Sequence, residues 1–89
     1  MNSRTLPSYW KTYDRLTARE RSRAEEAFAL FRENPAHPSL RFKLINRGEG
    51  LWSVRASLDL RALGLREGDT VTWFWIGRHK DYDRILGSG

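Results

Sequence analysis

The fold class of this chain is decided by the stretch Thr70-Val71-Thr72-Trp73-Phe74-Trp75-Ile76. β-branched and aromatic side chains of this kind fit the pleated, half-buried surface of a sheet. Because the run is apolar on both of its faces, it predicts a strand that is covered on both sides, in the centre of a sheet. Gly77 ends the predicted strand, and residues 78–86 predict a short C-terminal helix or turn. Residues 87–89 read Gly-Ser-Gly and predict a flexible end.

Further strands are predicted on the N-terminal side of this run. Side chains alternate between apolar and polar over residues 40–45, and two more strands are expected at residues 51–56 and 58–63. Residues 46–50 contain two glycines and predict a hairpin loop. Residues 66–69 predict a polar turn that contains a glycine. Together these segments predict an antiparallel meander of about four strands.

The first third of the chain has the spacing of helices. Tyr9, Trp10, Tyr13 and Leu16 recur at helical intervals, which predicts a helix over residues 8–16. The segment before it, around Leu6-Pro7, predicts a short edge strand, and the proline suits the entry to a helix.

A second helix is predicted from about residue 18 to residue 33. Thr17 and Glu20 have the spacing of a capping box, in which each side chain satisfies a backbone amide near the other residue. The expected apolar stripe consists of Ala24, Ala27, Phe28 and Phe31. Asn34-Pro35 ends the helix because the residue before a proline disfavours helical backbone angles.

These elements predict a single α+β domain over residues 1–89. Two N-terminal helices should pack on one face of a twisted antiparallel sheet of about four strands, followed by a short C-terminal helix or tail. The opposite face of the sheet is expected to stay open and to carry the function.

The composition narrows the classes of partner. The chain has 89 residues, a formal net charge of +5, and 16 basic residues, of which 13 are arginines. This excess of arginine indicates either a solubilising surface or a polyanionic partner, namely a nucleic acid or an acidic protein. With no cysteine and only two histidines, neither a metal nor a cofactor is expected. No stretch is long and apolar enough to span a bilayer, so the expected location is the cytoplasm, without membrane contact.

Two arginines stand out on the predicted sheet. A tight turn between the strands at 51–56 and 58–63 would place Arg55 beside Arg61, where both guanidinium groups can hold one phosphate. Arg41 and Lys43 on the preceding strand add positive charge to this RNA-binding surface. The alternative is that Arg55 forms a cross-strand ion pair with Asp59.

A second group of residues follows the central strand. His79 comes directly after it, and Tyr82 lies three residues later, on the same side of a helical turn. A histidine side chain can give or take a proton near neutral pH, and a tyrosine can stack on a base or hydrogen-bond a phosphate. With the arginines, these residues form a minimal set for RNA cleavage without a metal ion. Arg78 and Lys80 are further candidates for RNA binding. The alternative is a capping histidine and a core-packing tyrosine.

The order of these motifs resembles the RelE/ParE toxin superfamily of type II toxin–antitoxin systems. The resemblance runs from about residue 16 to residue 86, and its strand motifs are more specific than its helices. It is carried by Asn34-Pro35, His37-Pro38-Ser39-Leu40, Leu51-Trp52-Ser53-Val54-Arg55, Leu60-Arg61-Ala62-Leu63, Trp73-Phe74-Trp75-Ile76-Gly77, His79 and Tyr82-Asp83.

The resemblance implies a microbial RNase-like fold and a cognate antitoxin as partner. RelE-type members are metal-independent endoribonucleases that cleave mRNA on the ribosome and so inhibit translation. ParE-type members poison DNA gyrase and are not enzymes, and an inactive member would only bind its antitoxin. The presence of His79 and Tyr82 favours the RNase, with the gyrase inhibitor and the inactive binding module as alternatives.

The resemblance also implies roles for individual residues. Arg55 matches a strand cation of the RNase members, and Arg61 matches their phosphate-binding arginine. His79 and Tyr82 lie near the C-terminal acid and the tail aromatic of those members. Ser53 stands where some members have a lysine, and no residue matches the glutamate base of others, so the resemblance leaves the general base open.

Overall fold

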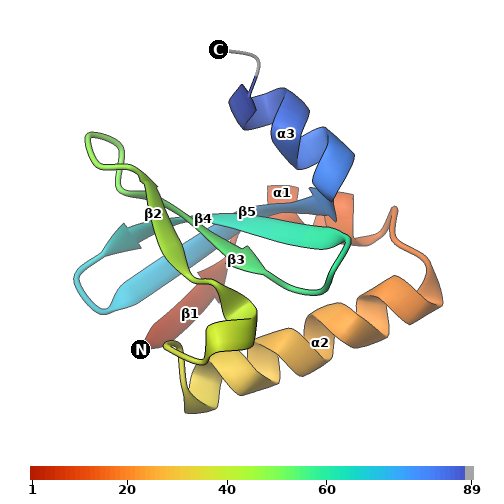
Figure 1. Ribbon diagram of the computed structural model, residues 1–89, viewed down its shortest axis with the longest axis horizontal. Coiled ribbons are helices and arrows are strands. Elements are labelled where there is room, and N and C mark those ends of the chain that lie inside the picture. The colour runs from red at the N-terminus through yellow and green to blue at the C-terminus, as the bar shows by residue number, and fades with distance from the viewer. Residues whose placement is uncertain (88–89) are drawn as a thin grey trace.

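The computed structural model describes residues 1–87 and has the α+β fold class that the sequence predicts (Figure 1). Of the predicted flexible end, residues 88–89 lie outside the described residues, and Gly87 is the last residue of α3. The elements, in chain order, are β1 (Asn2–Thr5), α1 (Pro7–Tyr13), α2 (Ala18–Glu33), the 3₁₀ turn η1 (Pro38–Leu40), β2 (Lys43–Asn46), β3 (Leu51–Arg55), β4 (Leu60–Glu67), β5 (Thr70–Arg78) and α3 (His79–Gly87).

The described residues form one sheet of five strands in the order β1-β5-β4-β3-β2. Strands β2 to β5 form the predicted antiparallel meander. The fifth strand is β1, which pairs with β5 in parallel from Asn2↔Thr70 to Thr5↔Trp73. The edge strand expected in the opening segment is β1, which ends at Thr5 just before Leu6-Pro7, and Pro7 begins α1 as predicted.

Several predicted strand boundaries are wrong. Gly77 does not end the central strand, since β5 continues to Arg78. Residues 38–40 form a 3₁₀ turn and Arg41 has a left-handed backbone (φ 43°), so the strand predicted from residue 40 begins only at Lys43. The strand predicted at residues 58–63 runs instead from Leu60 to Glu67, because it pairs with β5 along that whole length. The turn predicted at residues 66–69 is therefore only Gly68-Asp69, with Gly68 at positive φ.

Helix α2 begins and ends as its sequence predicts. The Thr17 side chain accepts a hydrogen bond from the Glu20 amide, and the Glu20 carboxylate accepts one from the Thr17 amide. Both halves of the capping box are present, so the orphan amide groups of the first turn are satisfied. Asn34 closes the C-terminal end.

The core lies between α2 and one face of the sheet. Phe31 is fully buried and packs edge-on against Trp73 of β5, with ring centroids 5.5 Å apart. The half-buried Phe28 contacts Trp73 in the same way at 5.2 Å. Val54 and Ala62 lie directly opposite each other on β3 and β4, and both are buried on this face. The predicted packing of the helical stripe on the sheet is thus confirmed.

Helix α1 protects the part of β5 that β1 does not reach. The ladder between β1 and β5 stops at Trp73. Beyond it, the Ser8 hydroxyl donates to the Phe74 carbonyl at 2.8 Å, and the Ile76 amide donates to the Thr12 hydroxyl at 3.0 Å. Two hydroxyl side chains of α1 therefore take the place of a neighbouring strand and block this sheet edge.

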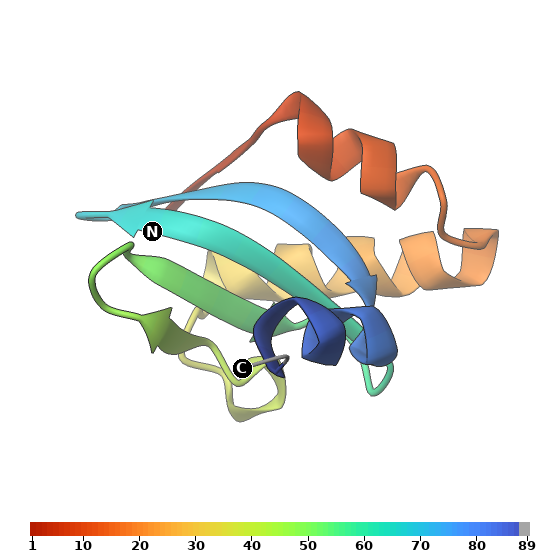
Figure 2. The same ribbon diagram turned by 90° about the horizontal axis from the view of Figure 1, so that it is seen from above.

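The face opposite α2 is partly covered. Figure 2 shows the sheet between α2 and α3, so the C-terminal helix lies over the face that was expected to stay open. Tyr82 is the buried residue of α3. The prediction that helices cover only one face is therefore wrong for α3, whose amphipathic side needs an apolar surface to pack against. Among residues 1–87, no helix has both the length and the apolar character needed to cross a bilayer.

Candidate functional site

Arg55 and Arg61 lie side by side on the face of the sheet that α3 partly covers. They are direct partners in the antiparallel register of β3 and β4, so their side chains leave the same face. Lys43 of β2 is the register partner of Ser53, which shares this face with Arg55. The structure thus brings together the two arginines and Lys43, as the sequence predicts.

One edge of the Arg61 guanidinium holds the loop between β3 and β4. Its Nη1 donates to the carbonyl oxygens of Ser57, Leu58 and Leu60, at 3.0, 3.2 and 3.0 Å. Among residues 1–87, its Nε and Nη2 atoms make no hydrogen bond to the protein. These two donors form the edge with which arginine binds a phosphate or carboxylate through two parallel hydrogen bonds.

The charges around Arg61 favour an anion. Burial lowers the pKa of the Arg61 guanidinium, and the positive charge of Arg55 lowers it further. Tyr82 and Asp83 raise this pKa, while the exposed Arg41 lowers it. Four residues from three segments of the chain therefore act on Arg61, and two of them, Arg55 and Arg41, are positively charged.

His79 is the first residue of α3, and it lies at the same end of the sheet as Arg61. Its amide donates to the Asp59 carbonyl at 2.7 Å, and its ring Nε2 lies 3.2 Å from Oδ1 of Asp83, one helical turn away. The ring is half exposed, and among residues 1–87 its Nδ1 has no hydrogen-bond partner. A carboxylate that holds one ring nitrogen orients the other toward a reacting group.

Tyr82 points into the protein. Its side chain is buried, and its hydroxyl donates to the hydroxyl of Ser53 at 3.2 Å. The ring centroids of Tyr82 and His79 are 6.2 Å apart. The core-packing alternative therefore describes the Tyr82 side chain, which docks α3 on the sheet beneath His79.

Arg78 lies on the other face of the sheet, because its register partner Leu60 faces α2. Its Nε and Nη2 donate to both carboxylate oxygens of Glu20, at 2.9 and 2.8 Å. The structure therefore does not bring Arg78 to the other basic residues. Lys80 is exposed in the first turn of α3. The alternative ion pair between Arg55 and Asp59 is not among the three salt bridges of residues 1–87.

The sequence analysis did not predict three of these side-chain pairings, namely those made by Asp83, Ser53 and Glu20. Asp83 was visible as an i,i+4 neighbour of His79 once a helix was predicted there. Ser53 and Glu20 carry no such signal, because they lie 29 and 58 residues from Tyr82 and Arg78. Within residues 1–87, no three histidine, cysteine or acidic side chains gather as metal ligands would.

A family model describing a ParE-like toxin domain matches residues 18–84, well over half of the chain. Comparison with curated protein sequences finds no significant match.

Solved structures of toxins have the same fold. A chain of the RelB–RelE antitoxin–toxin complex from Methanococcus jannaschii superposes with a TM-score of 0.72 at 13% identity, covering 93% of this chain and 98% of that one. A chain of the RelBE2 complex from Mycobacterium tuberculosis gives 0.70 at 20% identity, with coverages of 88% and 96%. The YoeB/ParE toxin from Agrobacterium tumefaciens gives 0.66 at 18% identity, with coverages of 89% and 99%.

At these sequence identities, the similarity to solved structures establishes the fold alone. The match of the sequence to the family model establishes the family. Both agree with the resemblance that the strand motifs indicate. The chain therefore belongs to the ParE-like toxin domain family.

Proposed function

We propose that this protein is the toxin of a toxin–antitoxin system and that it cleaves mRNA on the ribosome without a metal ion. The observation that carries the proposal is the unused edge of Arg61 beside Arg55, at the same end of the sheet as the His79–Asp83 pair. Arg41, Lys43 and Lys80 extend the positive charge along which an RNA backbone would lie.

The chemistry needs only groups of these kinds. The 2′-hydroxyl loses its proton and its oxygen attacks the adjacent phosphorus, after which the 5′-oxygen leaves and takes up a proton. Arg61 and Arg55 would stabilise the negative charge that gathers on the phosphate oxygens. His79 would carry out one of the two proton transfers through Nδ1, with Nε2 held by Asp83. Tyr82 would serve by holding α3, and with it His79, against the sheet.

The test is single-turnover cleavage of ribosome-bound mRNA by purified variants. Arg55→Ala and His79→Ala should each slow cleavage by about 100-fold or more. Arg61→Lys should keep little of the parental cleavage rate, because an ammonium group cannot replace the planar guanidinium. Arg19→Ala, which removes an exposed cation from α2, is the matched control and should cut at the parental rate. Parental cleavage by His79→Ala would rule out His79 as the proton-transfer group.

A second candidate function is inhibition of DNA gyrase, which the match to a ParE-like domain favours. The same preparations should be assayed for gyrase supercoiling and DNA breaks. DNA breaks with intact mRNA would select the gyrase inhibitor, whereas mRNA cuts at the ribosomal A site would select the RNase.

We also propose a cognate antitoxin as partner, since several similar structures are chains of antitoxin–toxin complexes. With a net charge of +5 on the toxin, an acidic or amphipathic segment is expected to cover the basic face. Purification of the protein expressed from its native operon should recover the partner, and charge reversal at Arg55 should weaken the complex. Recovery of the toxin alone would contradict this proposal.

A further inference from the structure

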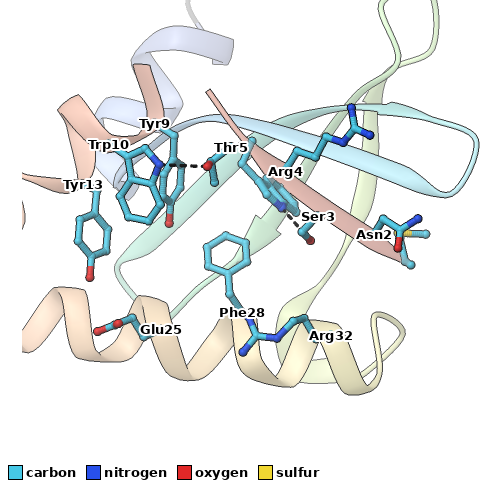
Figure 3. A pocket seen from close by; sticks show the side chains of 12 residues that line it. Asn2, Ser3, Arg4, Thr5, Tyr9, Trp10, Tyr13, Glu25, Phe28 and Arg32 are labelled. Atoms are coloured by element: carbon cyan, nitrogen blue, oxygen red, sulfur yellow. Dashed lines mark hydrogen bonds between the residues drawn. The ribbon is translucent and has the colours of Figure 1, made fainter. Parts of the chain in front are cut away.

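A second site candidate lies on the α2 side of the sheet, away from Arg55 and Arg61. A cavity of about 480 Å³ opens between β1, α1 and α2 (Figure 3). This volume is typical of sites for small molecules and cofactors. The RNA-cleavage proposal uses none of the residues that line it.

The cavity has an aromatic wall. It is formed by five side chains from α1, α2 and β5, namely Tyr9, Trp10, Tyr13, Phe28 and Trp73. Several of these rings meet edge to face, as Tyr9 and Trp10 do at 5.0 Å between centroids. The Trp10 ring is held by a hydrogen bond from its Nε1 to the Thr5 hydroxyl at 3.0 Å, yet the residue is 48% exposed. A rigid, accessible ring of this kind offers a stacking surface for a planar ligand.

One polar group in this wall lacks a partner. Tyr9 is only 3% exposed, and among residues 1–87 its hydroxyl makes no hydrogen bond. Figure 3 shows this hydroxyl directed toward the space above α2. Burial, followed by the charges of Tyr13 and Glu25, raises the pKa of Tyr9, so its phenol stays neutral and keeps its proton to donate. The Tyr9 hydroxyl is therefore free to donate a hydrogen bond to a ligand atom in the cavity.

The two ends of the cavity carry opposite charges. Glu25 lies at one end, next to Tyr13, and Arg32 lies further along α2, beside Phe28 (Figure 3). Arg4 of β1 also belongs to the lining, but its guanidinium points away from α2 (Figure 3). Neither Arg4 nor Arg32 takes part in a salt bridge among residues 1–87. A ligand that used both ends would present hydrogen-bond donors to a carboxylate and an anionic group to a guanidinium group.

We propose that this cavity binds a guanine nucleotide, either free or at the end of an RNA strand. The guanine ring would stack on Trp10, and its adjacent N1–H and N2–H₂ donors would bind the Glu25 carboxylate. The Tyr9 hydroxyl would donate to a base acceptor, and Arg32 would bind the phosphate. Adenine presents no such adjacent pair of donors, so the carboxylate selects guanine.

The test is calorimetric titration of the full chain with 5′-GMP, 5′-AMP, guanosine, and a short single-stranded RNA that has a 5′-terminal guanosine. GMP should bind at least about tenfold more tightly than AMP, and guanosine should bind more weakly than GMP. Tighter binding of the RNA than of GMP would identify an RNA end as the source of the ligand, and the reverse would identify the free nucleotide.

Variants separate this cavity from the basic face. Glu25→Gln should remove the preference for GMP over AMP, while Glu26→Gln, the next residue on α2, should keep it. Tyr9→Phe should weaken GMP about fivefold without loss of thermal stability, because the hydroxyl has no structural partner to lose. Arg61→Lys should leave GMP binding unchanged. Absence of saturable GMP binding, or GMP binding that is lost in Arg61→Lys and kept in Glu25→Gln, would overturn the proposal.

Discussion

Single side chains in this protein often hold the fold and shape the site at once. Arg61 is the clearest case, since Nη1 holds the loop between β3 and β4 while Nε and Nη2 face outward. Its removal would therefore disturb both the loop and the anion site. Arg55 makes none of the side-chain hydrogen bonds among residues 1–87, so Arg55→Ala reports on the charge alone. Variants of the two neighbours thus separate structural from chemical effects.

Gly64 of β4 is required by packing rather than by backbone freedom. A Cβ atom there would lie 2.6 Å from Cγ1 of Val71 and 2.7 Å from Cε3 of Trp73, and both side chains are fully buried. Gly64→Ala should lower the free energy of unfolding by about 1–3 kcal/mol because these side chains cannot move aside. Urea unfolding measures the effect. Gly48→Ala, in the loop after β2, is the control, and equal stability of the two variants would contradict the prediction.

At the scale of elements, α3 is the helix that covers part of the sheet face opposite α2 (Figure 2). It follows β5 directly and is docked by the buried hydrogen bond from Tyr82 to Ser53. Ile85, one turn further along, is half exposed. The position of His79 over the sheet therefore depends on the Tyr82 side chain together with the hydrogen bond from the His79 amide to the Asp59 carbonyl.

A double-mutant cycle tests this attachment. Tyr82→Phe and Ser53→Ala should each lower the free energy of unfolding by about 1 kcal/mol, because each leaves a buried hydroxyl without its partner. The double variant should lose less than the sum, since it leaves no unsatisfied group. Chemical denaturation of the four proteins gives the coupling energy. Strict additivity would show that the hydrogen bond does not hold the helix.

The contact between α2 and β5 predicts a dependence of stability on pH. The hydrogen bond from the Thr17 backbone is the main cause that lowers the pKa of Glu20 below its ordinary value of 4.5, and Arg78 lowers it further. The stabilisation by the ionised carboxylate is therefore complete above pH 4.5 and is lost as the pH falls through the folded-state pKa.

Glu20→Gln should thus be less stable than the parent at pH 7, by about 1 kcal/mol, because glutamine keeps the cap but loses the ion pair with the half-exposed Arg78. The difference should shrink as the pH falls below 4.5. Thermal unfolding across this range measures it, with Glu26→Gln as the matched variant. A difference that stayed constant with pH would exclude the ionised carboxylate as its cause.

At the scale of the whole molecule, the two faces of the sheet differ in character. The α2 face holds the aromatic core and, at its edge, the cavity beside β1. The α3 face carries the cluster of Arg41, Lys43, Arg55 and Arg61. A polyanion and a small planar ligand would therefore meet different sides of the protein.

This separation predicts the salt dependence of RNA binding. Each phosphate contact should contribute about −0.7 to the slope of log affinity against log salt concentration for a single strand. Lys43→Ala should make the slope less steep by about that amount, whereas Arg19→Ala on α2 should leave it unchanged. Fluorescence anisotropy of a labelled RNA over a range of salt concentrations measures both slopes. A steeper change for Arg19→Ala would place the RNA on the α2 side.

The sequence by itself determined the elements, because their signals are local. The capping box of α2 joins residues three positions apart, and the alternation in β3 placed Arg55 and Trp52 on opposite faces. A short loop between β3 and β4 was enough to predict that Arg55 and Arg61 would meet. Contacts between neighbours in the chain thus determined the fold class and the centre of the basic surface.

Only the tertiary structure decided which face each remaining element covers. The parallel pairing of β1 with β5, the docking of Tyr82 on Ser53 and the ion pair of Arg78 with Glu20 all join distant residues. Each depends on how apolar surfaces pack once the sheet exists, and no local spacing encodes that choice. The same packing decided which candidates could share a site, and it left Arg78 on the α2 side with Glu20 while Arg61 kept an unused edge beside Arg55.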